Sequence, residues 1–135
     1  MQNKKQLIIL SAELKVLSNY DNAYRTDLLR KMLFDIGVPF NSVRGYYDGH
    51  SEASFLVEVK NSAQFEAVKN YALNIFEQES ILYQETSGLC SLLFSDGKVQ
   101  KLGNMCEVKE SEAKENVAYT SFRDSNNRER FFICK

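Results

Sequence analysis

Two Asp-Gly dipeptides, Asp48-Gly49 and Asp96-Gly97, constrain the fold of this chain more than any other feature. Asp-Gly favours the tight turn of a β-hairpin, because its glycine accepts the positive φ that such turns need. Each dipeptide lies between two apolar stretches, so each predicts a pair of adjacent antiparallel strands. The expected strands are 40–47 and 53–60 at the first turn, and 89–94 and 99–102 at the second.

Two amphipathic helices are predicted between and beside these strands. Their apolar residues recur at helical spacing. The first set is Leu28, Leu29, Met32, Leu33 and Ile36, and the second is Phe65, Val68, Ala72, Ile75 and Phe76. Gly37 and Pro39 end the first helix. Asn61 caps the second, and Gln64 can reach back to complete a capping box.

The whole element order predicts an α+β fold. Further strands are expected at 7–17, 80–83 and 131–134, while 107–115 suits a short exposed helix or a solvated loop equally well. The order β-α-β-β-α-β, followed by more strands, is typical of a largely antiparallel sheet with two helices packed on it and a C-terminal β extension. Residues 1–135 are expected to form one domain, large enough to bury a core without disulfide or metal staples.

The composition of the chain limits the kinds of molecule that it is expected to bind. The chain is 44% hydrophobic and 26% charged, with a net charge of −1, which is ordinary for a globular protein and argues against general DNA or RNA binding. A local basic pocket for one small anion remains compatible with it. The only early apolar run, 7–10, is too short for a signal peptide or a membrane span, so a cytoplasmic location is expected. Three widely spaced cysteines predict reduced thiols and no zinc site.

Aromatic and basic residues interleave in the last seventeen residues. They are Tyr119, Phe122, Arg123, Arg128, Arg130, Phe131 and Phe132. An aromatic ring can stack on a base, and a guanidinium group can bind phosphate through two hydrogen bonds. The alternative is a hydrophobic terminal strand whose arginines are simply solvated.

Recognisable catalytic motifs are missing from the sequence. His50, the one histidine, lies at the Asp48-Gly49 turn two residues before Glu52 and could perform acid–base chemistry, but turn histidines are usually solvated polar residues. There is no phosphate-binding loop, metal-ligand cluster or nucleophile elbow. The sequence therefore predicts a protein that binds a ligand without transforming it, with no cofactor and no metal.

Four short motifs resemble, in their order and separation, the phage anti-Thoeris sponge family. They are Asn22-Ala23-Tyr24-Arg25, Val43-Arg44-Gly45-Tyr46-Tyr47 with Gly49, Glu52-x-Ser54-Phe55, and Phe76-x-Gln78 continuing to Tyr83. The resemblance extends over roughly residues 7–135. It implies capture of the cyclic ADP-ribose isomers that bacterial TIR proteins make, without cleavage. It also implies assembly as dimers or hexamers, and a second site for cyclic oligonucleotides in some members.

The resemblance also implies four ligand contacts. Arg25 lies at the first helix, Phe94 would stack on adenine, Asn104 would contact the base or ribose, and Arg123 would bind the diphosphate. The polar tail leaves Arg128 or Arg130 as alternatives to Arg123. From the residues alone, Arg25 suits a solvated helix position, Phe94 a core position and Asn104 a turn.

The resulting hypothesis is a homo-oligomeric cyclic-nucleotide sponge in the bacterial cytoplasm during phage infection. Two alternatives belong to other classes. One is a nucleotide hydrolase or phosphodiesterase that uses His50 and Glu52. The other is a protein-interaction module that docks a partner on the C-terminal aromatic residues.

Overall fold

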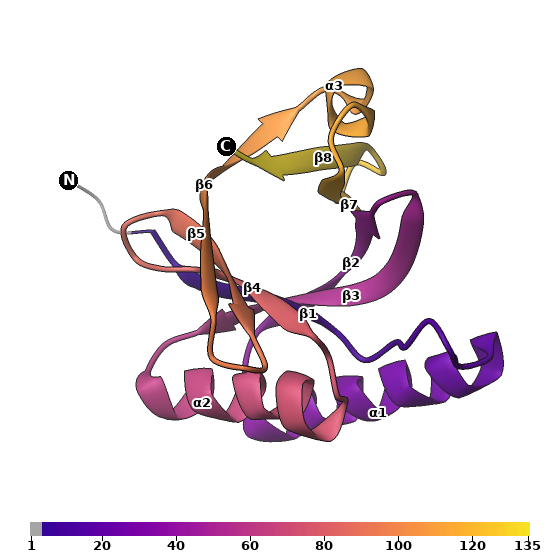
Figure 1. Cartoon of the computed structure of the whole chain (residues 1–135), viewed down its shortest axis with the longest axis vertical. Helices are drawn as coiled ribbons and strands as arrows, with labels where there is room; N and C mark the ends of the chain where they lie inside the picture. Colours follow the sequence, from indigo (N-terminus) through magenta and orange to yellow (C-terminus); the bar gives the residue numbers. More distant parts are fainter. Residues whose placement is uncertain (1–3) are drawn as a thin grey trace.

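The computed structural model describes residues 4–135 of the chain. Eight strands and three α-helices succeed one another along it, with one π-helical turn (Figure 1). In chain order they are β1 Gln6–Ser11, α1 Asn19–Ile36, β2 Phe40–Tyr47, β3 His50–Val59, α2 Ser62–Asn70, η1 Tyr71–Ile75, β4 Ser80–Gln84, β5 Leu89–Phe94, β6 Val99–Val108, α3 Glu110–Lys114, β7 Ala118–Arg123 and β8 Glu129–Cys134.

The strands form a closed antiparallel barrel in the order β1-β3-β2-β7-β8-β6-β5-β4. The prediction of a largely antiparallel sheet with two helices packed on it and a C-terminal β extension is therefore wrong. β7 and β8 do not extend the sheet but close it, because β7 pairs with one part of β2 and β8 pairs with one part of β6. β2 pairs with β3 throughout and with β7 only from Arg44 to Tyr47. β6 pairs first with β5 and then, from Met105, with β8.

α1 and α2 lie outside the barrel, below β1, β3 and β4 in the view of Figure 1. The main hydrophobic core fills the layer between these helices and the strands. Ile8, Val57 and Leu33 are completely buried there. Because side chains alternate along a strand, the other residues of β1 and β3 point away from the helices, toward the barrel interior.

The stop signal of α1 and the cap of α2 act as the sequence predicts, but the capping box at Gln64 differs by one residue. α1 ends at Gly37, whose φ is 77°. The side chain of Asn61 accepts a hydrogen bond from the Gln64 amide at 2.8 Å and so caps α2. The Gln64 side chain accepts in turn from the Lys60 amide at 2.8 Å, one residue earlier than a capping box requires.

The strand predictions need two corrections, and the alternative left open at 107–115 is decided in favour of a short helix. The strand expected at 7–17 ends at Ser11, since the chain turns away from the sheet there. The strand β7 was not anticipated. Of the segment 107–115, Glu110–Lys114 is helical. No helix within 4–135 combines the length and the apolar character that crossing a membrane requires.

Candidate functional site

A short irregular segment follows β1, and side chains from α1 hold its main chain. The Arg25 guanidinium donates to the carbonyl of Ala12 at 2.6 Å and to that of Phe76 at 2.5 Å. The buried Asn22 side chain bonds both the amide and the carbonyl of Leu14, at 2.9 and 3.0 Å. The segment therefore has a fixed path although it belongs to no helix or strand.

The same segment places the carboxylate of Glu13 against the edge of β3. Glu13 Oε2 accepts from the Ala53 amide at 2.8 Å. Ser11 Oγ donates to the Ala53 carbonyl at 2.8 Å and accepts from the Glu13 amide at 3.0 Å. Gln78 Nε2 donates to the Glu13 carbonyl at 2.9 Å. Side chains thus replace the strand partner that Ala53 loses where β1 leaves the sheet.

Glu52 lies beside this point with its carboxyl group half-buried. Burial raises its pKa above the ordinary value, the nearby Glu13 carboxylate raises the pKa further, and Lys15 partly offsets both. On the neighbouring strand, Gly45 lies directly opposite Glu52. A Cβ on Gly45 would lie 3.2 Å from Ser54 Oγ and 3.9 Å from the Glu52 side chain, so this glycine leaves room beside the carboxyl group.

Glu52 begins a row of directly opposed residues that crosses five strands of the barrel. Directly opposed residues of antiparallel strands point to the same face, and this row alternates with the residues that pack on α1 and α2. It therefore faces the barrel interior. The row consists of Glu52, Gly45, Thr120, Phe132 and Glu107.

The far part of this row carries a flat aromatic surface. The rings of Phe122 and Phe132 stack with centroids 5.5 Å apart and planes 6° from parallel. The Arg130 guanidinium lies 5.7 Å from each ring. Arg130 also bonds both carboxylate oxygens of Glu107, at 2.9 and 2.6 Å, and this bond lowers the pKa of Glu107. Both rings remain partly exposed and could receive a planar group.

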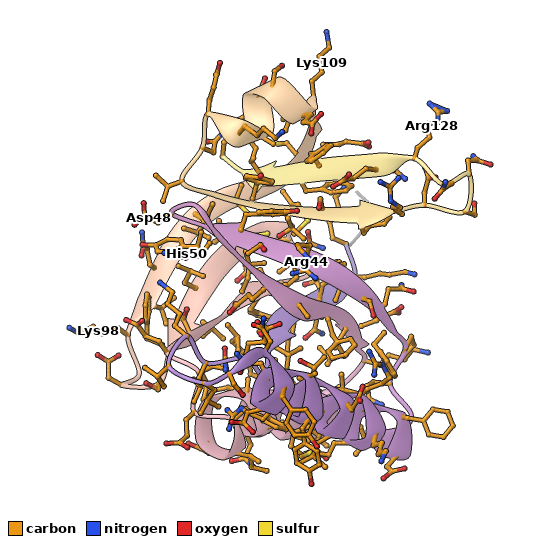
Figure 2. The ribbon with its side chains drawn as sticks, turned by 90° about the vertical axis from the view of Figure 1, so that its right-hand side faces the viewer. Arg44, Asp48, His50, Lys98, Lys109 and Arg128 are labelled. Carbon is orange, nitrogen blue, oxygen red and sulfur yellow. The ribbon has the colours of Figure 1, made fainter. Side chains whose placement is uncertain are left out.

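A second candidate region is a groove between β2 and β7, where the two strands separate. Its volume is about 360 Å³, and Arg44 and Arg123 line it together with Ser42, Tyr46 and Ser121. Arg123 bonds the carbonyl of Asn127 at 3.1 Å and lies 3.6 Å from Glu129. Figure 2 shows Arg44 well away from Asp48 and His50, which lie at the end of the β2–β3 hairpin.

The four predicted ligand contacts lie on four different elements. Arg25 of α1 is bound to main-chain carbonyls and lies 5.3 Å from the ring of Phe76. Phe94 ends β5, Asn104 is exposed on β6, and Arg123 ends β7. Within residues 4–135, no hydrogen bond, ion pair or ring contact joins any two of them. Their ligand roles stay predictions.

The two alternatives to Arg123 differ in their surroundings. Arg128 extends from the β7–β8 turn into solvent (Figure 2). Arg130 is paired with Glu107 and faces the barrel interior. The described residues contain no group of three or more His, Cys, Asp or Glu side chains placed to hold a metal ion.

Sequence reasoning overlooked Glu13 and the side chains around it. Glu52 was considered only as a partner for His50, which is exposed at the hairpin turn. The available signal was a carboxylate two residues after a strand, followed by one buried polar residue, Asn22, on α1. That signal is weak, because the Ala53 amide and the Gln78 side chain, which bond Glu13, are 40 or more residues away in the chain.

Comparison with known families gives this arrangement its chemical context. A model of the S-adenosylmethionine lyase family matches residues 8–134, so the chain belongs to that family. None of the curated proteins compared with the chain matches it. The family is of a phage type and is compatible with an anti-defence protein. It is named for an enzyme, so the prediction of a protein that binds its ligand without transforming it is wrong.

Proposed function

We propose that this chain is a lyase that breaks a carbon–sulfur bond of S-adenosylmethionine at the inner face of the barrel, beside Glu52. One observation carries the proposal. In a chain of this family, a half-buried carboxyl group of raised pKa lies opposite a glycine that leaves it space. Perturbed carboxyl groups in such surroundings are characteristic of functional sites.

The proposed reaction needs few catalytic groups from the protein. The sulfur of S-adenosylmethionine is positively charged and leaves as a neutral thioether, so no acid is needed for the leaving group. The substrate's own carboxylate can attack the carbon bonded to sulfur and close a five-membered lactone. One carbon–oxygen bond forms, one carbon–sulfur bond breaks, and no water is consumed. Orientation is then the main catalytic contribution.

Glu52 and Glu13 suit the α-ammonium group of the substrate. The positive charge on sulfur disappears as the carbon–sulfur bond breaks. A carboxylate next to the sulfur would therefore stabilise the bound substrate more than the transition state. The ammonium group keeps its charge throughout the reaction. A carboxylate that binds it orients the substrate's reacting carboxylate and stabilises the substrate and the transition state equally. Glu52 receives this group in our proposal, with Glu13 adding negative potential.

The adenine ring would stack on the surface of Phe122 and Phe132. Phe132 lies in the same inner row as Glu52, three strand spacings away, which is roughly 14 Å along the sheet. This matches the length scale of an extended nucleoside joined to an amino acid. Aromatic stacking of a base contributes about 1–3 kcal/mol.

The test is incubation of the purified protein with S-adenosylmethionine and mass spectrometry of the products. We expect 5′-methylthioadenosine and homoserine lactone with no added cofactor. Glu52→Gln should lose most of this activity. Glu58→Gln, a carboxylate on the same strand that pairs with Lys5 at 3.5 Å, should retain it. Unchanged substrate with folded wild-type protein would overturn the proposal.

Binding of cyclic ADP-ribose isomers is a second candidate, favoured by the two arginines of the β2–β7 groove. Arg44 and Arg123 could each make a charge-assisted bond to a diphosphate. Titration calorimetry with these isomers, compared with Arg44→Gln, tests it, and absence of heat with every isomer would remove it. Under this second candidate function, the chain would assemble as the dimer or hexamer that the resemblance implies. Light scattering that reports a monomer would exclude that assembly.

A further inference from the structure

The segment 11–14 is held far more firmly than an ordinary surface connection. The amide of Glu13 and the carbonyls of Ala12, Glu13 and Leu14 all have side-chain partners. Two of these partners, Asn22 and Gln78, are polar residues that are buried from solvent. Buried polar side chains are costly to leave unpaired, so this segment has one strongly preferred conformation.

The backbone that follows α2 places Gln78 beside Glu13. Its last turn widens into the π-helical turn η1, and Glu77 then adopts a left-handed conformation with φ 57°. Single π-helical turns and left-handed non-glycine residues often accompany functional sites. Here they present the Phe76 carbonyl to Arg25 and the Gln78 amide to Glu13. Gln78 also donates to the Phe76 carbonyl at 3.3 Å, which joins the two.

We propose that Arg25 and Gln78 are positioning residues, which fix the main chain of Ala12 and Glu13 so that the Glu13 carboxylate stays beside Glu52. The inference rests on the proposed function, because Glu52 is the group whose environment it explains. It also gives Arg25 a role other than ligand binding, since both of its described hydrogen bonds go to main-chain carbonyls.

If Arg25 and Gln78 position Glu13, their loss should change the pKa of Glu52, which a loss of loop stability alone would not do. Charged groups near Glu52 come from the segment after β1, namely Glu13 and Lys15, while His50 lies two residues before it on the same strand. Burial raises the pKa of Glu52, and a firmly held Glu13 raises it further. If the segment loosens, Glu13 moves away on average and the pKa of Glu52 falls.

The experiment measures the Glu52 carboxyl group directly by carbon-13 NMR titration. Arg25→Lys is the main variant because it retains the positive charge but cannot reach both carbonyls at once. Glu13→Gln should lower the pKa of Glu52, and Arg25→Lys should lower it by a smaller amount. In the Glu13→Gln background, Arg25→Lys should produce no further change. Arg30→Lys, a matched change at an exposed position of the same helix, should leave the pKa unaltered.

Gln78→Leu provides an independent version of the test with no change of charge. It should lower the pKa of Glu52 in the same direction as Arg25→Lys. A lower melting temperature with an unchanged Glu52 pKa in both variants would overturn the proposal. An equal shift with and without Glu13 would also overturn it, because Arg25 would then act on Glu52 directly.

Activity adds a readout that depends on the proposed reaction. Loosened positioning should lower kcat by about tenfold in Arg25→Lys while the wild-type fold is retained. If the wild type has no lyase activity, the proposed function fails, yet the NMR comparison still decides whether Arg25 and Gln78 position Glu13. The two failures are therefore distinguishable.

Discussion

The two sides of the barrel differ in how completely they are covered. On the side of α1 and α2, Ile8, Val57 and Leu29 have no exposed surface at all. On the opposite side, α3 is a helix of five residues that covers part of β7 and β8. The rings of Phe122 and Phe132 there remain partly exposed on the inner face.

This contrast separates stability from ligand contact. The helix-covered side supplies the buried apolar area and the fixed segment that carries Glu13. The less covered side supplies accessible aromatic groups. A site that spans both can keep its carboxylates rigid while its stacking surface stays open to a ligand.

The largest expected effect is on the helix-covered side. Phe55 is 1% exposed and packs edge-on against Phe40 with ring centroids 5.6 Å apart. Phe55→Ala should lower the free energy of unfolding by about 3–5 kcal/mol, because it leaves a cavity in the main core. Phe132→Ala should cost clearly less. Equal losses in chemical denaturation would contradict the contrast between the two sides.

Gly103 tests how the barrel closes on the other side. Its φ is 102°, and a Cβ there would lie 2.5 Å from the main-chain carbon of Lys135, which no side-chain adjustment can relieve. Gly103→Ala should weaken the end of the β6–β8 pairing and cost roughly 1–3 kcal/mol from backbone strain alone. Hydrogen exchange should accelerate at the amides of Asn104 and Lys135, which bond each other's carbonyls at 2.9 Å.

Gly97→Ala is the matched control for that change. Gly97 has a similar φ of 91°, but nothing lies within 4 Å of the added Cβ. It should show the strain without the clash, and should leave exchange at Asn104 unchanged. Equal acceleration in both variants would mean that the close approach at Gly103 is unimportant.

Glu52→Gln should stabilise the fold while it impairs activity. Because the folded-state pKa of Glu52 is raised, the folded protein binds its proton more tightly than the unfolded chain does. Ionisation therefore costs stability as pH rises from the ordinary value of 4.5 through the folded-state pKa. The variant should melt higher than the wild type at neutral pH, and the difference should vanish at acid pH. A lower melting temperature at neutral pH would contradict this.

Much of the local structure was predictable from sequence, and the reason lies in short-range chemistry. The strands 40–47 and 89–94 and the end of α1 at Gly37 follow from turn dipeptides, alternation and capping. Barrel closure was not predictable in the same way. It depends on β2 meeting β7 and β6 meeting β8, and nothing within either strand specifies a partner so distant in the chain.

The candidate site was predictable only in part for the same reason. Glu52 could be noticed beside a turn, but its raised pKa comes first from burial and then from Glu13, which folding brings from 39 positions earlier. The ligand role of Arg25 stays a prediction, and the sequence did not indicate that its guanidinium would bind the carbonyls of Ala12 and Phe76. A residue type indicates what a side chain can bind, but only the fold determines which partner it finds.

The smallest expected effect has the opposite pH dependence and lies on the less covered side. The pKa of Glu107 is lowered, chiefly by its hydrogen bond with Arg130. Its contribution to stability is therefore present above the ordinary pKa and is lost as pH falls through the folded-state pKa. Glu107→Gln should melt slightly lower than the wild type at neutral pH, and the difference should shrink in acid and in high salt, because the pair is exposed. Thermal melts of the Glu52 and Glu107 variants over one pH series should thus deviate from the wild type in opposite directions. If both deviate in the same direction, the assignment of a half-buried carboxyl group to one side and a solvated ion pair to the other is wrong.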